Sequence, residues 1–135
     1  MKEILLMSLI IVFIGCANKD RAQKEKNEDF SSFYQKFYTD TIFQDSRILK
    51  PLEGTIKSWN DEDVVREESW INRKIRITPK EKFLESYKNL KTELLKSDSS
   101  VAEKYWIDQS GFFVRRKFIL KKGKWYLFSY DISNL

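Results

Sequence analysis

The sequence predicts an α+β domain in which a long N-terminal helix and a second helix pack on a curved antiparallel sheet. Residues 29–43 place their apolar side chains at helical spacing, and residues 78–97 repeat that pattern. Residues 101–132 instead contain three apolar and aromatic runs separated by Gly111 and Gly123, which is typical of strands joined by tight turns. Helices followed by a run of sequential strands indicate the α+β class.

Composition limits the architecture and the chemistry. The chain has 135 residues, enough for one domain with a hydrophobic core, and 15% of them are aromatic. Cys16 is the only cysteine, so an intramolecular disulfide is excluded. The chain has no histidine, which excludes a Ser-His-Asp or Cys-His hydrolase and leaves a zinc site without its usual ligands. We therefore expect no metal and no cofactor.

The first sixteen residues have the pattern of a bacterial lipoprotein signal. Lys2 precedes a short apolar run, residues 4–15, which is too short to span about 30 Å of hydrocarbon comfortably. The run ends in Phe13-Ile14-Gly15-Cys16, which resembles a lipobox although Phe13 stands where leucine is usual. We expect cleavage before Cys16 and lipidation of its thiol. The alternatives are an uncleaved anchor helix and an ordinary signal with an incidental cysteine.

This signal sets the expected domain boundaries and location. Residues 1–15 are the signal peptide, residues 16–28 are the lipidated cysteine and a polar tether, and residues 29–135 are the single domain. A tether of about a dozen residues has a reach of about 20 Å. We expect a protein of the bacterial cell envelope, on the outer rather than the inner membrane, with its periplasmic or surface face left open.

The elements before the C-terminal sheet follow from local signals. The helix over 29–43 is capped by Asn27 or Asp29. A turn or short helical stub then leads into an extended edge segment near Pro51, because proline forbids a continuing helix. Further on, the expected elements are a strand over 55–59, a solvated acidic turn over 60–63 and one or two strands within 64–77. Thr78-Pro79-Lys80-Glu81 has the form of a capping box that opens the second helix.

Three strands are expected in the C-terminal third, over 101–107, 112–120 and 125–132. With Lys122-Gly123 at the hairpin tip, Leu120 pairs with Trp125, Phe118 with Leu127 and Arg116 with Ser129. The first face is then formed by Phe112, Val114, Arg116, Phe118, Leu120, Trp125, Leu127, Ser129 and Asp131. The second face is formed by Phe113, Arg115, Lys117, Ile119, Tyr126, Phe128, Tyr130 and Ile132.

Charged residues on these two faces have a structural and a functional interpretation. Arg116 and Asp131 lie diagonally across the first face, either as an ion pair at the edge of the core or as an anion-binding pair at a pocket mouth. On the second face Arg115 lies opposite Tyr130, and Lys117 opposite Phe128, as cation–π pairs. Such a mixed face suits a dimer interface, lipid headgroups or plain solvent.

The hairpin tip is the densest basic region. Lys121, Lys122 and Lys124 stand close to Arg115 and Lys117 in the sequence, and residues 66–135 carry 16 basic against 9 acidic side chains. Tip lysines keep hairpins soluble, and they also suit anionic lipid or an acidic partner. Behind a lipoprotein signal, we do not expect nucleic acid as a partner.

The order of elements resembles the nuclear-transport-factor-2-like (NTF2-like) α+β cone. The positions that carry a resemblance to an uncharacterised bacterial lipoprotein family with that fold are Phe30, Phe33, Phe37, Asp40, Phe43-Gln44, Arg47-Ile48, Pro51-Leu52 and the segment 123–127. The resemblance implies a pocket between the long helix and the concave sheet face, and often dimerisation through the outer face. It implies no activity. By this analogy Asp40, Gln44 and Arg47 lie near the pocket or its helix–sheet seam, where their alternative role is local capping.

The sequence therefore favours a lipid-anchored, non-catalytic module that binds a small molecule or peptide in its pocket. Candidate pocket or seam residues are Asp40, Gln44, Arg47, Arg116, Tyr130 and Asp131. The alternative is an interaction or scaffold lipoprotein that docks a partner, or itself, through the basic aromatic sheet face. A third alternative is a histidine-free isomerase or lyase that uses Asp40 or Asp131 with Tyr130 or Tyr38.

Overall fold

The computed structural model describes residues 26–59 and 63–135. The predicted signal peptide, Cys16 and most of the tether lie outside the described residues, as does most of the acidic turn at 60–63. The described helices are α1 (Phe30–Thr39), α2 (Thr41–Ser46) and α3 (Lys80–Ser86). The strands are β1 (Ile48–Glu53), β2 (Thr55–Trp59), β3 (Val65–Ser69), β4 (Lys91–Lys96), β5 (Ser100–Trp106), β6 (Phe113–Lys121) and β7 (Lys124–Asn134).

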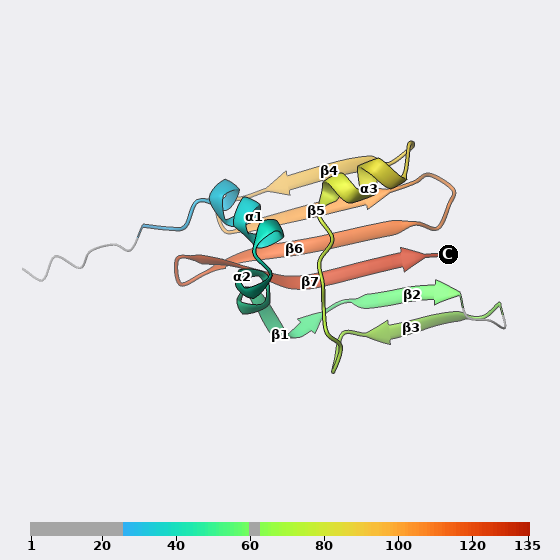
Figure 1. The fold of residues 1–135 in the computed structure, drawn as a ribbon, viewed down its shortest axis with the longest axis horizontal. Coiled ribbons are helices and arrows are strands. Elements are labelled where there is room, and N and C mark those ends of the chain that lie inside the picture. The colour runs from blue at the N-terminus through green and yellow to red at the C-terminus, as the bar shows by residue number, and fades with distance from the viewer. Residues whose placement is uncertain (1–25, 60–62) are drawn as a thin grey trace, which may run out of the picture.

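One seven-stranded sheet forms the body of the domain. Its strand order is β3-β2-β7-β6-β5-β4, and β1 also pairs with β7. Strands β1 and β2 run parallel to β7, whereas the other pairs are antiparallel. The helices lie on one face of the sheet, and the chain between β3 and α3 crosses that same face (Figure 1). Among the described residues, no helix has the length and apolarity needed to cross a membrane.

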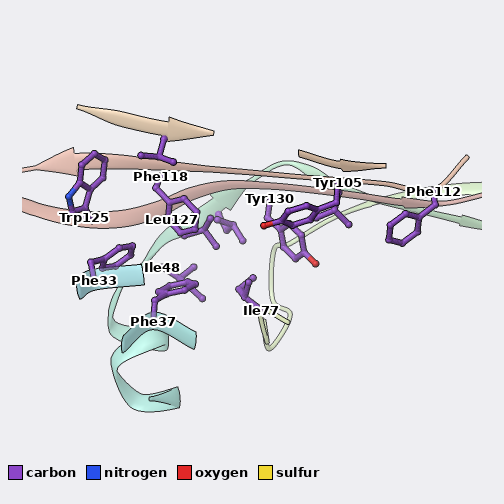
Figure 2. Close-up of a cluster of buried hydrophobic side chains, with 13 residues drawn as sticks. Phe33, Phe37, Ile48, Ile77, Tyr105, Phe112, Phe118, Trp125, Leu127 and Tyr130 are labelled. Carbon is purple, nitrogen blue, oxygen red and sulfur yellow. The ribbon is translucent and has the colours of Figure 1, made fainter. Parts of the chain in front are cut away.

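The core lies between this covered face, here called the concave face, and the helices. Phe33 and Phe37 of α1 are almost fully buried, and their ring centroids lie 5.8 and 5.6 Å from that of Phe118 on β6. Figure 2 shows them pointing from α1 toward the sheet, while Trp125 and Leu127 project from the sheet toward α1. The aromatic stripe predicted over residues 29–43 is therefore core.

The helix predicted over 29–43 is interrupted at Asp40, so the expectation of one continuous helix is wrong. Asp40 has an extended backbone, φ −121° and ψ 107°, and it ends α1 and caps α2. Its carboxylate accepts a hydrogen bond from the backbone N–H of Phe43 at 2.9 Å. An aspartate competes with the helical backbone in this way, and here it turns the chain toward β1. The predicted cap at Asp29 is confirmed, because its side chain accepts from the Ser32 N–H.

The second helix is much shorter than predicted. Helix α3 ends at Ser86, and residues 91–96 form the edge strand β4, in which Leu94 pairs with Glu103 of β5. Leu94 and Leu95 are both about half exposed, on opposite faces of this strand. The unpaired edge of β5 offers ladder hydrogen bonds that outweigh the helical spacing of the leucines. The predicted capping box is also absent, since Pro79 holds the N-cap position without a side-chain hydrogen bond.

The C-terminal hairpin has the predicted tip. Lys122 and Gly123 have φ values of 49° and 74°, as a two-residue hairpin turn of type I′ requires. The pairs Leu120–Trp125 and Phe118–Leu127 are confirmed. A bulge follows them, because the register shifts between Lys117 and Phe118, and Phe128 is the extra residue on β7.

The bulge exchanges the two predicted faces beyond Leu127. Arg116 pairs with Tyr130 rather than Ser129, and Arg115 pairs with Asp131. The predicted pairs Arg116–Asp131, Arg115–Tyr130 and Lys117–Phe128 are therefore wrong. One additional residue in β7 is sufficient for this result, since side chains alternate between the faces of a strand.

The extended segment around Pro51 and the strand over 55–59 are confirmed as β1 and β2. Gly54 joins these two strands where they run along β7, with φ +104°. A Cβ atom at Gly54 would stand 2.1 Å from the carbonyl oxygen of Tyr130, so only glycine fits there. Within 64–77 the structure forms one strand, β3, and then the crossing segment, whose Trp70 ring stacks on Tyr130 with centroids 4.7 Å apart.

Candidate functional site

A cleft of about 290 Å³ opens on the concave face between α1, the start of α3 and the strands β4 and β5. Helix α1 contributes Phe30, Ser31, Tyr34 and Gln35, and α3 contributes Lys80 and Glu81. The strands contribute Thr92, Glu93, Leu94, Lys96, Glu103 and Tyr105. The cleft has the size and mixed lining of a small-molecule site.

Strand register places the inner residues of the cleft. Thr92 pairs with Tyr105 and Leu94 with Glu103, so these four side chains share the concave face. Because β4 is an edge strand, its side chains leave the cleft open on that side. The floor of the cleft is formed by the buried residues Glu103 and Tyr105 of β5.

Glu103 is the charged residue of the floor. It is 2% exposed. Its Oε2 atom accepts hydrogen bonds from the hydroxyls of Tyr105 at 2.7 Å and Tyr38 at 3.4 Å. The guanidinium Nη1 of Arg116 lies 3.8 Å from the same oxygen. A buried carboxylate requires such compensation, and here two donors and one cation converge on one atom.

Arg116, on the neighbouring strand β6, is fully buried. It donates hydrogen bonds of 2.6 Å to the Tyr38 hydroxyl and to the backbone carbonyl of Thr78. Four rings surround the guanidinium carbon at 5.3 to 5.6 Å, those of Tyr38, Phe83, Tyr105 and Tyr130. Its Nε atom has no hydrogen-bond partner among the described residues. Arg116 therefore connects the sheet, α1 and the crossing segment beneath the cleft.

Burial raises the pKa of three tyrosines around Glu103 and Arg116. Desolvation is the main cause for Tyr34, Tyr38 and Tyr105, and the charge of Glu103 adds to it in each case. For Tyr38 and Tyr105 the cation of Arg116 opposes the shift without cancelling it. All three hydroxyls therefore keep their protons in the folded protein well above the pH at which a free tyrosine ionises.

These raised pKa values predict a loss of stability in alkali. A tyrosine whose pKa is raised by folding contributes stability that is complete below its unfolded value of about 10 and is lost as the pH rises above it. We expect the free energy of unfolding to fall above pH 10, by about 1.4 kcal/mol per pH unit for each such tyrosine. Urea unfolding at pH 8 to 11.5 measures this. Tyr38→Phe should have a shallower slope, and an unchanged slope would contradict the prediction.

The residues predicted near the helix–sheet seam have structural contacts there. Gln44 is buried and donates to the carbonyls of Phe37 and Ile77, while its Oε1 accepts from the Ile77 N–H at 3.1 Å. Arg47 forms a bidentate ion pair with Glu28, in which Nη1 donates to Oε2 at 2.9 Å and Nη2 donates to Oε1 at 3.0 Å. Asp40 caps α2, as described above. None of Asp40, Gln44 and Arg47 is among the residues that line the cleft.

The predicted site residues on the sheet, Arg116, Tyr130 and Asp131, do not share one face. Arg116 and Tyr130 lie together beneath the concave face, with 5.4 Å from the guanidinium carbon to the ring centroid. Asp131 lies on the opposite face, where it accepts from Arg115 at 2.9 Å and from the Thr55 N–H. Lys117 is half-buried on that outer face, whereas the tip lysines Lys121, Lys122 and Lys124 are exposed.

Sequence reasoning missed Glu103, Tyr34 and Tyr105 as residues of the site. A signal for Glu103 was present, because residues 101–106 alternate in a strand pattern and Glu103 shares its face with Val101 and Tyr105. A carboxylate on an apolar strand face indicates a buried, compensated charge. Its partner could not be assigned in the same way, since Arg116 lies opposite Glu103 only in the register that β5 and β6 adopt in the folded sheet.

The helices packed on one face of a curved sheet give this chain an α+β fold that is similar to a solved NTF2-like structure, as expected. An NTF2-like protein from Bacteroides fragilis NCTC 9343 is similar at a TM-score of 0.51 and 20% identity, over 84% of this chain and 50% of that one. A protein from Bacteroides uniformis ATCC 8492 is similar at a TM-score of 0.54 and 25% identity, over 81% and 78%. The chain thus spans half the length of the Bacteroides fragilis protein.

The chain belongs to the family described as Domain of unknown function (DUF4348), whose sequence profile matches residues 11–131. The predicted resemblance to an uncharacterised family with the NTF2-like fold is confirmed. A comparison with curated protein sequences finds no significant match.

Proposed function

We propose that this protein is a non-catalytic module that binds a small molecule in the cleft above Glu103, and that a lipid on Cys16 holds it at the cell envelope. The small-molecule part of this proposal is supported by the residues at the floor of the cleft. A carboxylate that is 2% exposed lies there among aromatic side chains and lines an open site. A concave site that combines aromatic walls with a few well-placed polar groups is a usual form of a ligand site.

The contacts of Glu103 support binding rather than proton abstraction. Its Oε2 is held by two tyrosine hydroxyls and faces Arg116, so the carboxylate charge is already stabilised where it stands. A general base would have to give up that stabilisation on accepting a proton. Neither Asp40 nor Asp131, the carboxylates considered for an isomerase or lyase, lines the cleft.

The start of the domain supports an orientation at the membrane. The backbone N–H of Glu28 donates to the Gly123 carbonyl at 2.8 Å, and the Glu28 carbonyl accepts from the Trp125 indole at 2.9 Å. The chain therefore joins the domain beside the hairpin tip that carries Lys121, Lys122 and Lys124 (Figure 1). A tether from a lipidated Cys16 would bring this basic tip toward anionic headgroups.

The proposal is tested by native mass spectrometry on the full-length protein, purified gently from its own cells. We expect a discrete small-molecule adduct on the protein, together with a mass increase on the N-terminal peptide that corresponds to a lipidated Cys16. An unmodified Cys16 would overturn the anchor.

The same spectrum distinguishes the second candidate function, docking through the outer sheet face. A hollow on that face is lined in part by Phe113, Arg115 and Asp131, which favours a protein contact there. A dimer or heteromer without an adduct would favour docking and would contradict the binding module.

A further inference from the structure

We infer that the basic hairpin tip is a second membrane contact, which binds anionic phospholipid headgroups beside the lipid anchor, and that Glu28 holds the tip in position for this contact. This inference rests on the lipid anchor of the proposed function and specifies the partner of the tip. It follows from the contacts of Glu28, from the length of the tether and from the charges of the tip.

Glu28 is the residue through which the tether joins the domain, and every polar group of this residue is hydrogen-bonded. Its backbone N–H donates to the Gly123 carbonyl, and its carbonyl accepts from the Trp125 indole. Its carboxylate accepts from the Trp125 backbone N–H at 2.8 Å and forms the bidentate ion pair with Arg47. We call these contacts the Glu28 clamp. Because Asp29 already caps α1, the clamp is not needed to begin the helix. It fixes the place at which the tether leaves the domain.

The clamp attaches the tether to the hairpin tip. Gly123 and Trp125 both belong to that hairpin, and a Cβ atom at Gly123 would stand 3.8 Å from the side-chain oxygen of Asn27. Arg47 also donates to the Trp125 carbonyl at 3.0 Å. The side chains of Arg47 and Glu28 are only 13% and 24% exposed, and salt screens a partly buried ion pair less than an exposed one. The clamp is therefore expected to persist at salt concentrations that weaken surface charges.

The length of the tether keeps the tip near the membrane. Cys16 precedes Glu28 by a segment of about a dozen residues, which has a reach of about 20 Å. A lipid on Cys16 would therefore confine the clamped tip to a thin layer above the bilayer, where its effective concentration toward the headgroups is high. This confinement favours the phospholipid surface over an acidic protein as the partner of the tip.

The charges of the tip are not compensated within the domain. Lys121, Lys122 and Lys124 are exposed, and none of them forms an ion pair with another described residue. Lys57 and Arg115, on the outer face of the sheet, are each paired with a carboxylate. Clustered lysines next to a membrane anchor are attracted by anionic headgroups, each by about fivefold in affinity.

The test places the full-length protein in two kinds of vesicle, phosphatidylcholine alone and phosphatidylcholine mixed with phosphatidylglycerol. Flotation measures attachment, and brief acetylation followed by peptide mass spectrometry measures the accessibility of the lysines. We expect the tip lysines to be acetylated about fivefold more slowly in the anionic vesicles at low salt, and equally in both vesicles at high salt.

Lys74 and Lys88 are the internal controls for acetylation. Both are exposed, and neither forms an ion pair with a described residue. The segment between α3 and β4, which contains Lys88, lies at the opposite end of the sheet from the tip (Figure 1). We expect the two control lysines to react at the same rate in both vesicles.

Glu28→Ala tests the clamp, because it removes the carboxylate contacts and leaves the tip lysines in place. The protection of the tip in anionic vesicles should fall by about twofold or more, since the tip is then held less closely to the tether. Glu53→Ala removes an exposed carboxylate of β1 and should keep the protection of the wild type. Glu28→Gln serves the same purpose if urea unfolding shows that Glu28→Ala is not folded. Full protection in the folded Glu28 variant would overturn the role of Glu28.

The outcomes separate this inference from the proposed function. Flotation with both vesicles and equal acetylation of the tip in both would overturn the membrane contact and leave the lipid anchor, as expected if the tip instead faces an acidic protein. Flotation with the anionic vesicles alone, with a protected tip, would contradict the anchor and support the contact. Flotation with neither vesicle would contradict both.

Discussion

Replacing Arg116 by methionine is expected to lower the free energy of unfolding by about 3–5 kcal/mol. The substitution keeps an apolar side chain of similar length but leaves the Glu103 carboxylate buried without its cation. It also removes the hydrogen bonds to the Tyr38 hydroxyl and to the Thr78 carbonyl. Urea unfolding followed by tryptophan fluorescence measures the change.

The matched control for Arg116 is Lys117→Met, one residue along β6 on the outer face. We expect it to change stability by less than about 0.5 kcal/mol, because Lys117 is half-exposed there. A double variant, Glu103→Leu with Arg116→Met, should recover much of the lost stability, since it removes the unpaired charge as well. Equal effects of Arg116→Met and Lys117→Met would contradict the buried pair.

Replacing Gly54 by alanine is expected to lower the free energy of unfolding by about 2–4 kcal/mol. Its φ of +104° is unfavourable for any side chain, and the new Cβ would lie 2.1 Å from the Tyr130 carbonyl oxygen. The contact cannot be relieved by a side-chain rotation, because the blocking atom belongs to the backbone of β7. Thermal and urea unfolding both report the loss.

Gly123→Ala is the matched control for Gly54, because it shares a positive φ, +74°, without a close contact. The nearest atom to its Cβ would be the Asn27 side-chain oxygen at 3.8 Å. We expect a cost of about 1 kcal/mol from the backbone conformation alone. Equal costs at the two glycines would show that β1, β2 and β7 are not packed as described.

Local signals in the sequence predict much of this fold. Strands β5, β6 and β7 fall within two residues of their predicted bounds, because alternating apolar residues and the Lys122-Gly123 turn act over short distances. The aromatic stripe of α1 is likewise predicted by its helical spacing, and the cap at Asp29 by the residue type at the helix start.

The wrong predictions concern features that depend on distant partners. Residues 91–96 have helical spacing but pair with β5, and only the folded sheet provides that edge. The bulge in β7 has no local marker at Phe128, yet it decides that Tyr130 and not Asp131 lies beside Arg116. The predicted candidates Arg116, Tyr130 and Asp131 lie on β6 and β7, whereas the cleft is lined from β4 and β5. Its buried carboxylate, Glu103, was missed.

The central claim is that the cleft between α1 and β4–β5 holds a small molecule, and a matched pair of substitutions tests it most directly. Leu94 and Leu95 are adjacent and similarly exposed on β4, but Leu94 lines the cleft and Leu95 does not. Leu94→Trp should obstruct the cleft and abolish the adduct in native mass spectra, while Leu95→Trp should retain it at the wild-type level. An adduct retained in full by Leu94→Trp would place the ligand elsewhere and contradict the account.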